Sequence, residues 1–465
     1  MNQDQPFYRA GAAREVVNPG YFRSRPEPEP EYRWDPISST CPASITWEKN
    51  LDGMVEYLTQ KGIAWTVLHL GVLNEVVTVA ILYESTEDGV WDRQVIEQDL
   101  RNLYLPSEIF PQIKYSQAVV NKEAGGEADK YGSEQSCGAR IGIKDLSWTA
   151  GTVGGYFEAE SGDLYGLTCH HVLLPTKNRR ALDDDDESRP RLPLKKGYPE
   201  YLDSIGIHHA AFRPENGTIE VVQPPSQDHA ETLRGLQVFI KRSEEGLEDI
   251  RTKYRMADTL LPSSKTTMWE RRIEEANGQL EVISSYNRAF GVVVASSGYK
   301  VDPKTQHSID WALFKIPSDR PVWNMLRLVE GKNRPGVWDS LSTDQVSLGG
   351  VADPTEGEEV FKFGGTTGAT FGVVNGVKDS VNLRENLRET REWCVLGRNG
   401  RTFSDAGDSG SLVFNQQFQV IGIITAGCDY SGRLTYITPI KLVLLDIQQS
   451  TGLRLSFWNN EGVNL

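Results

Sequence analysis

The segment SDAGDSGSLVF, residues 404–414, places Ser409 between Asp408 and Gly410, with Gly407 shortly before it. One interpretation is a tight turn that enters an apolar strand, because glycine adopts positive φ at little cost and Asp and Ser bond to their own backbone. The other is a nucleophilic serine whose flanking glycines let backbone N–H groups face a developing oxyanion. The second interpretation requires a base and an orienting carboxylate elsewhere in the chain.

The histidines restrict where such a base can lie. All of them precede Ser409, at positions 69, 170, 171, 208, 209, 229 and 307. An α/β-hydrolase uses G-x-S-x-G in the chain order Ser, acid, His. Here Ser411 stands in place of the last glycine and no histidine follows, so that class is excluded and the order His, Asp, Ser remains. No Cys or carboxylate spacing around the other histidines indicates a metal site.

These residues require a β-rich framework to position them. Short β-runs with glycine turns begin after residue 137, as in TAGTVGGYFEAESGDLYGLTC, and resume after residue 290 with FGVVVASSG and IDWALFKI. This spacing is typical of an antiparallel barrel or sandwich. A helix is expected in the closing segment TPIKLVLLDIQQSTG, whose apolar residues can pack back on a barrel.

Three motifs, in order, resemble the chymotrypsin- and trypsin-like (PA clan) serine proteases, including intracellular and Deg-type proteins. LTCHHV, residues 167–172, is similar to the segment that presents the catalytic histidine, and IDWALFKI, residues 309–316, to the strand that presents the aspartate. GDSGSLV, residues 407–413, is similar to the nucleophile loop. The resemblance implies a mainly β, chymotrypsin-like double antiparallel β-barrel.

The resemblance also implies a serine endopeptidase that hydrolyses peptide bonds through an acyl-enzyme, without a cofactor. His171 rather than His170 is then the base, because the family's catalytic histidine directly precedes an apolar residue, here Val172. Asp310 is then the carboxylate that orients the imidazole, with Asp302 and Asp319 as nearby alternatives. The implied site residues are His171, Asp310 and Ser409 for catalysis, Gly407 and Ser409 for the oxyanion hole, and Phe403, Thr425, Ala426 and Gly427 for substrate binding. Nothing near Ile141 resembles an activation site of digestive trypsins, so activity should not require cleavage there.

The chain also contains segments that the resemblance to the double barrel does not cover. Apolar residues recur at helical intervals in two stretches separated by LLPSSK, which predicts an antiparallel helical hairpin. The predicted segments are a disordered Pro/Glu-rich tail at 1–41, a small α/β domain at 42–120, the first β-barrel at 137–320 with an insertion at 175–290 that holds the hairpin at about 231–286, and the second β-barrel with a C-terminal helix at 336–450.

The net charge, the apolar runs and the cysteine content indicate which binding partners and which cell compartment to expect. The net charge is −15, with 49 Lys and Arg against 64 Asp and Glu, which argues against nucleic acid or an anionic membrane. No apolar run reaches the length of a transmembrane helix, and the five cysteines suggest no disulfide framework, so we expect an intracellular, cytoplasmic or nuclear protein. The expected partners are a polypeptide substrate and a protein bound by the N-terminal domain or the hairpin. The alternative function is a catalytically silent protease-fold scaffold or protein-interaction module.

Overall fold

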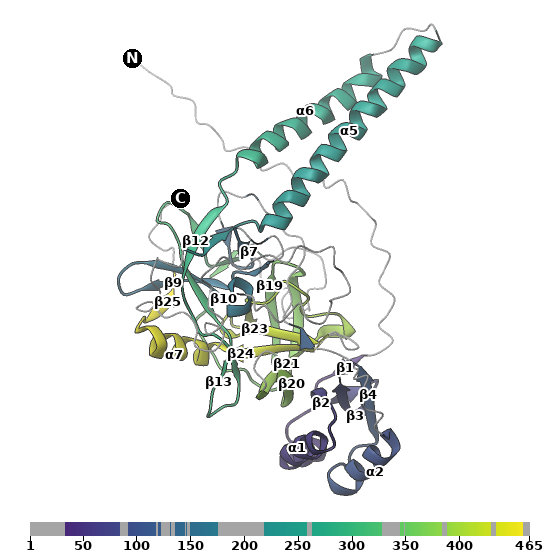
Figure 1. The fold of residues 1–465 in the computed structure, drawn as a ribbon, viewed down its shortest axis with the longest axis vertical. Coiled ribbons are helices and arrows are strands. Elements are labelled where there is room, and N and C mark those ends of the chain that lie inside the picture. Colours follow the sequence, from purple (N-terminus) through teal and green to yellow (C-terminus); the bar gives the residue numbers. More distant parts are fainter. Residues whose placement is uncertain are drawn as a thin grey trace. The chain divides into compact units, whose positions relative to one another are not determined.

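The computed structural model describes residues 33–83, 92–117, 120–121, 131, 135–144, 146, 149–174, 218–257, 263–327, 345–347, 349–383, 388–428 and 434–458. The chain divides into two compact units, of which one is described at Ala230–Tyr286 and the other comprises Glu29–His229 and Asn287–Leu465 (Figure 1). Residues 1–32 of the tail predicted at 1–41 lie outside the described residues. Its last part is corrected, because Trp34 and Ile37 are buried and β1 pairs with a neighbouring strand.

The larger sheet contains a closed barrel in the C-terminal part of the chain. Its strands follow the order β19-β22-β23-β24-β21-β20, and because β19 also pairs with β20, the ring closes. Their bounds are β19 (Glu359–Gly364), β20 (Gly368–Leu383), β21 (Arg388–Gly397), β22 (Leu412–Asn415), β23 (Val420–Cys428) and β24 (Leu434–Pro439), followed by α7 (Ile440–Thr451). Val374, Val395 and Ile424 are buried in its core. β-branched side chains of this kind suit a pleated, buried surface.

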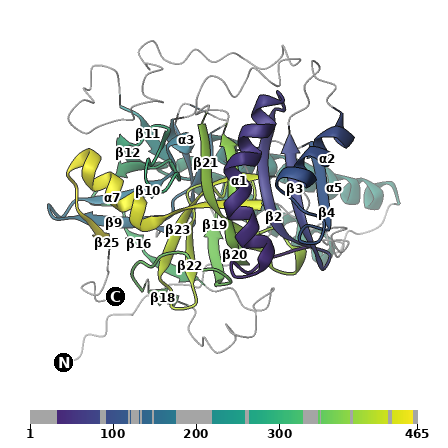
Figure 2. The same cartoon turned by 90° about the horizontal axis from the view of Figure 1, so that it is seen from below.

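The N-terminal elements extend the same sheet. They are β1 (Trp34–Asp35), α1 (Pro42–Gln60), β2 (Trp65–Leu73), β3 (Val76–Tyr83), α2 (Arg93–Leu103) and β4 (Gln112–Gln117). Both helices lie on one face of these strands, where Trp47, Leu58 and Leu100 are fully buried (Figure 2). Val67 of β2 pairs with Val381 of β20, so these strands continue the barrel sheet rather than form a sheet of their own.

The second large sheet has the order β25-β9-β10-β15-β12-β11-β7-β8. Its strands are β7 (Arg140–Ile143), β8 (Gly151–Thr152), β9 (Gly155–Ala159), β10 (Leu164–Thr168), β11 (Glu220–Val222), β12 (Ala289–Ser296), β15 (Ala312–Lys315) and β25 (Leu455–Phe457). The mainly β prediction is therefore confirmed. The segment predicted as an insertion at 175–290 is not wholly separate from the sheet, because β11 lies inside it and pairs with both β7 and β12. Residues 175–217 of that insertion lie outside the described part.

Smaller elements complete the described structure. They are α3 (His170–Leu173), the 3-10 turn η4 (Arg398–Gly400), β5 (Val120–Asn121), β6 (Gln135–Ser136), β13 (Lys300–Val301), β14 (Ser308–Ile309), β16 (Val322–Trp323), β17 (Met325–Arg327) and β18 (Gln345–Ser347). Among them, β14 leads directly into Asp310, so its position in the fold sets the position of that carboxylate.

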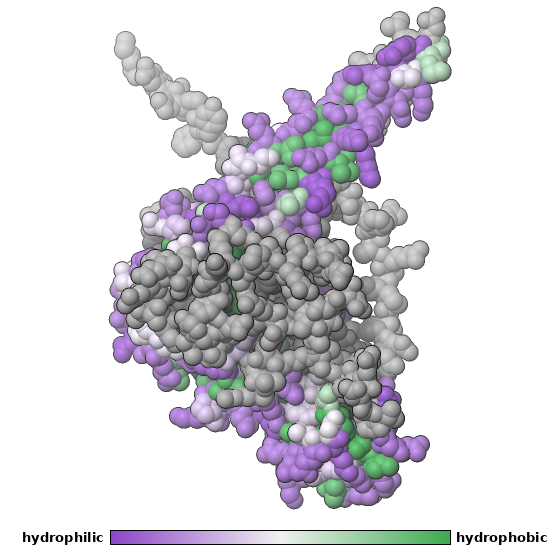
Figure 3. Space-filling model, in the orientation of Figure 1, coloured by the Kyte–Doolittle hydropathy of each residue, from purple (hydrophilic) through white to green (hydrophobic). Residues whose placement is uncertain are grey.

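Two long helices form the smaller unit. They are α5 (Ser226–Met256), whose first turn belongs to the larger unit, and α6 (Ser263–Ser285). Leu247, Ala276 and Ile283 are buried, and apolar side chains gather between the helices in Figure 3. A Cβ added at Gly246 would lie 3.2 Å from the Trp269 ring, which shows how closely the helices approach.

No helix among the described residues combines the length and apolarity that a bilayer crossing needs. All five cysteines fall within the described ranges, and each is a thiol rather than half of a disulfide.

Candidate active site

His171 is held at the start of the short helix α3, where β10 ends. Its Nδ1 lies 2.7 Å from Asp310 Oδ2, and its backbone N–H donates to Asp310 Oδ1 at 3.2 Å. Both side chains are buried, with 4% and 0% of their surfaces exposed. Because the carboxylate binds the ring and the backbone of the same residue, it fixes the ring orientation and favours the tautomer with the proton on Nδ1.

The backbone that leads into Asp310 is held by a buried contact that the sequence motifs do not reveal. Glu392 of β21 accepts the Ser308 N–H at 2.7 Å through Oε1, and its Oε2 lies 3.0 Å from His307 Nδ1. The Thr438 hydroxyl donates to the Ser308 carbonyl at 2.8 Å. The segment just before Asp310 is thereby tied to the barrel that carries Ser409. No local pattern marks Glu392, which stands alone in REWCVLG.

The competing residues have other roles in the structure. The Asp302 carboxylate accepts N–H groups of Lys304 and Thr305 in its own turn, at 3.2 and 2.7 Å. Asp319 is exposed in a turn after β15. His170 lies 3.0 Å from the Ser296 hydroxyl through Nδ1 and packs edge-on against a tyrosine ring. Of these candidates, the structure brings only His171 and Asp310 together.

The loop that carries Ser409 is shaped by two glycines. Gly407 and Gly410 have φ of 92° and 94°, a region that side-chain-bearing residues rarely adopt. Thr152 of β8 donates to both sides of the serine, from its hydroxyl to the Gly407 carbonyl at 2.7 Å and from its N–H to the Ser409 carbonyl at 2.9 Å. Ser409 itself is 5% exposed.

One carbonyl joins the serine loop to the helix that holds the histidine. The Ile424 carbonyl in β23 accepts the N–H of Gly410 at 2.9 Å and the thiol of Cys169 at 3.2 Å. Gly410 follows Ser409, and Cys169 is the N-cap residue of α3. The two segments therefore converge on one point of β23.

The two backbone donors implied for the oxyanion hole are both in this loop. Within the described ranges, no hydrogen bond engages the N–H of Gly407 or of Ser409. The carbonyl of Asp408, which shares a peptide unit with the Ser409 N–H, accepts the Ser411 N–H at 2.9 Å. In a trans peptide the N–H points away from the C=O, so the Ser409 N–H is directed away from that turn.

The residues implied for substrate binding occupy different environments. Phe403 is fully buried in the core of the closed barrel, so its side chain presents no surface to a ligand and a substrate would have to contact its backbone. Thr425 and Ala426 are buried within β23 and Gly427 is partly exposed. Gly427 pairs with Asn121 of β5, so another segment of the chain lies along this edge of the strand.

Two buried groups have the composition of metal ligands. The ligand atoms of Cys169, His171 and Asp310 lie within 4.8 Å of one another, as do those of a second group, His69, Asp379 and Cys394. In each group the histidine Nδ1 is already at hydrogen-bond distance from the carboxylate, 2.7 Å in the first and 2.9 Å in the second. An ion bound between those two atoms would have to displace that hydrogen bond, since a metal ligated at about 2.0–2.2 Å must separate its ligands further.

The chain matches the profile of one family, Peptidase family S64, over residues 219–456, which is just over half of its length. This range includes Asp310 and Ser409, whereas His171 lies before it. A search of the curated proteins finds no match.

Several solved structures are similar to the chain at low identity. Thermobifida fusca protease A is 13% identical, over 70% of this chain and 100% of that one, with a TM-score of 0.34. A Nocardiopsis protease is 12% identical, over 69% and 98%, with a TM-score of 0.32. Cellulomonas bogoriensis chymotrypsin is 20% identical, over 36% and 81%, with a TM-score of 0.24.

Proposed function

Because the chain belongs to peptidase family S64 and is a serine-type peptidase, we propose that it hydrolyses internal peptide bonds of polypeptides through His171, Asp310 and Ser409. The family match confirms the trypsin-like resemblance that the sequence motifs indicated. The roles of the individual residues are the proposal, and they follow from the chemistry that each side chain can perform.

Ser409 is the nucleophile in this proposal. A serine hydroxyl is weakly nucleophilic at neutral pH, so His171 Nε2 accepts its proton as Oγ attacks the substrate carbonyl. The N–H groups of Gly407 and Ser409 stabilise the oxyanion, an effect of about 3–4 kcal/mol for one such donor. His171 then gives the proton to the leaving amine, which leaves an acyl-enzyme on Ser409. Water, activated by the same imidazole, hydrolyses this ester.

The observation that carries the proposal is the buried pairing of His171 with Asp310. A carboxylate that accepts from both the ring and the backbone of one histidine holds the imidazole in one orientation and stabilises its protonated form. The shared Ile424 carbonyl supports the proposal further, because it ties the histidine helix to the loop that carries Ser409.

The finer architecture belongs to the same proposal. We assign the sheet at residues 137–320 as the first barrel of a chymotrypsin-like peptidase and the closed barrel within 336–450 as the second. The N-terminal elements and the hairpin are proposed to bind a protein partner. A cytoplasmic or nuclear location is supported by the five thiols, which persist in a reducing compartment.

One observation favours the second candidate function, a protease-fold scaffold without activity. β5 pairs with Gly427 and Cys428 of β23, along the edge implied for substrate. If this pairing persists in solution, a polypeptide cannot add to that edge as a strand.

Reaction with a fluorophosphonate probe distinguishes the two functions, because the probe modifies only an activated serine. The full-length protein should be labelled at neutral pH, while Ser409→Ala should not. A folded, monodisperse wild-type protein that stays unlabelled favours the scaffold.

A further inference from the structure

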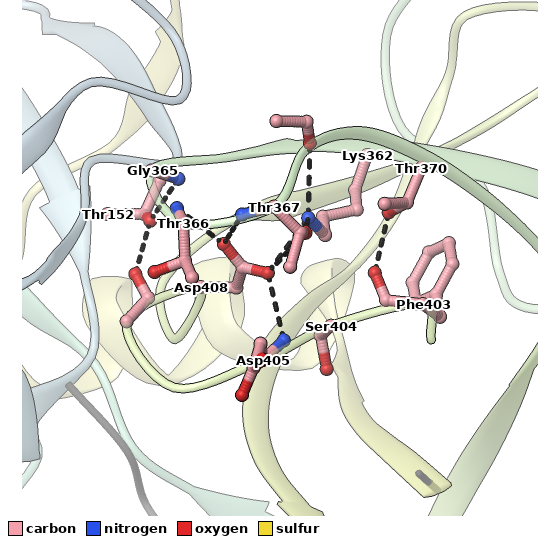
Figure 4. Close-up of polar contacts among 12 residues, drawn as sticks. Thr152, Lys362, Gly365, Thr366, Thr367, Thr370, Phe403, Ser404, Asp405 and Asp408 are labelled. Carbon is pink, nitrogen blue, oxygen red and sulfur yellow. Dashed lines mark hydrogen bonds and ion pairs between the residues drawn. The ribbon is translucent and has the colours of Figure 1, made fainter. Parts of the chain in front are cut away.

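Lys362 of β19 is a fully buried cation next to the serine loop. Its Nζ lies 2.9 Å from Asp408 Oδ2, and neither side chain is exposed. The ammonium also donates to the Thr367 hydroxyl and, at 3.1 Å, to the Gly368 carbonyl (Figure 4). An ammonium has three donors, and here each has an acceptor. Such complete pairing is what permits a charge to be buried.

The carboxylate of Asp408 is surrounded by donors in the same way. Its Oδ1 accepts the N–H groups of Thr366 and Thr367, at 2.9 and 3.2 Å. Its Oδ2 accepts the Thr367 hydroxyl at 2.6 Å and the Asp405 N–H at 3.0 Å, besides Lys362. Burial by itself would raise the pKa of this carboxyl, but Lys362 and the hydrogen bonds outweigh it, so the pKa lies below its ordinary value.

These contacts fix the orientation of the peptide units that carry the oxyanion donors. Asp408 bonds back to Asp405 through its side chain and its N–H, which closes the loop on itself. The Ala406 carbonyl accepts the Thr366 hydroxyl, and the Asp408 carbonyl accepts the Ser411 N–H. Because both carbonyls are held by the protein, the N–H groups on the opposite sides of those peptides are held as well.

We propose that Lys362 is a positioning residue of the active site, whose buried ammonium anchors Asp408 and thereby holds the N–H groups of Gly407 and Ser409 toward the substrate carbonyl. This inference rests on the proposed peptidase function. The cation comes from within the chain, on a strand of the same barrel.

The pair is enclosed so closely that Gly364 leaves no room beside it for a side chain. A Cβ added at Gly364 would lie 2.2 Å from Asp408 Oδ1 and 2.7 Å from Lys362 Nζ. Lys362→Met keeps most of the length of the side chain but removes its charge, so it leaves the buried carboxylate without its cation. Thr367→Val keeps both charges and the shape of the side chain but removes the hydroxyl that bridges them.

The test measures the rate constant of fluorophosphonate labelling together with the free energy of unfolding in urea. Lys362→Met should label about 100-fold more slowly, the effect of losing one oxyanion donor, with the midpoint of its pH–rate profile unchanged because His171 is untouched. Thr367→Val should label about tenfold more slowly, as for one lost hydrogen bond to a charged group. Asp379→Asn disrupts the buried contact with His69, which involves no residue of the serine loop, and serves as the control for lost stability.

The outcomes separate this inference from the proposed function. If the wild type is not labelled, the proposed function fails first. If the wild type is labelled and folded Lys362→Met labels equally fast, Lys362 has no positioning role. Equal slowing in Asp379→Asn at equal loss of stability also overturns the inference, because the effect then follows stability alone. If Lys362→Met does not fold, Thr367→Val decides, and a wild-type rate in that variant refutes the proposal.

Discussion

Replacing Gly410 by alanine should both destabilise the protein and abolish the reaction of Ser409 with the fluorophosphonate probe. The added Cβ would lie 2.3 Å from the Thr152 carbonyl oxygen and 2.3 Å from the Thr168 hydroxyl oxygen. Neither atom can retreat freely, because the Thr168 hydroxyl donates to that carbonyl at 2.7 Å. Positive φ costs an alanine about 1–2 kcal/mol and overpacking of a tight site about 1–3 kcal/mol. We therefore expect Gly410→Ala to lower the free energy of unfolding by about 2–5 kcal/mol.

Gly162→Ala is the matched control for this substitution. Gly162 also has positive φ, 81°, but no atom lies within 4 Å of an added Cβ there. Its cost should be the backbone contribution alone, about 1–2 kcal/mol, with probe labelling retained. Urea unfolding with equal m-values gives both free energies, and labelling of Ser409 gives the functional readout. Equal losses of stability in the two variants would refute the steric reasoning, and normal labelling of Gly410→Ala would refute the need for this loop shape.

Three further predictions concern the base, its support and the hairpin. His171→Ala should abolish probe labelling while His170→Ala retains it, and the reverse pattern would reassign the base. Glu392→Gln should lower the free energy of unfolding by about 1–3 kcal/mol in urea titration, because the buried groups of His307 and Ser308 lose a charged hydrogen-bond acceptor; an unchanged value would show that this charge contributes nothing. Replacing residues 231–286 by a short Gly/Ser linker should leave a folded, probe-reactive protein, whereas an aggregated product would show that the helices are needed by the barrels.

Those parts of the site that lie in local motifs could be predicted from the sequence. Ser409 and its glycines are contiguous, and His171 and Asp310 each lie in a short motif that resembles the trypsin-like proteases. That resemblance predicted the contact between His171 and Asp310 that the structure contains, while the role of Ser409 stays a prediction. The heptad-like spacing of the hairpin is local as well. By contrast, β11 is a short strand whose partners β7 and β12 lie far away in the chain.

The environment of Lys362 shows why the remaining features could not be predicted. In FKFGG the lysine stands between two phenylalanines, and the usual alternation would place its charge in solvent. The structure instead puts Val360 and Lys362 on buried positions of β19, because Asp408 arrives from a distant loop to pair with the ammonium. The burial of Phe403 could not be predicted for a similar reason, since only the closed barrel shows that its side chain belongs to the core.

The most direct test of the proposed chemistry is the site of covalent modification in the full-length protein. After reaction with a fluorophosphonate at neutral pH and without prior proteolytic treatment, mass spectrometry should find one adduct, on Ser409, and none in Ser409→Ala. Turnover of a polypeptide by the variant should fall by several orders of magnitude, because members of a triad act as a unit. An adduct on another serine, or a folded wild-type protein without any adduct, would contradict the assignment of Ser409 as the nucleophile.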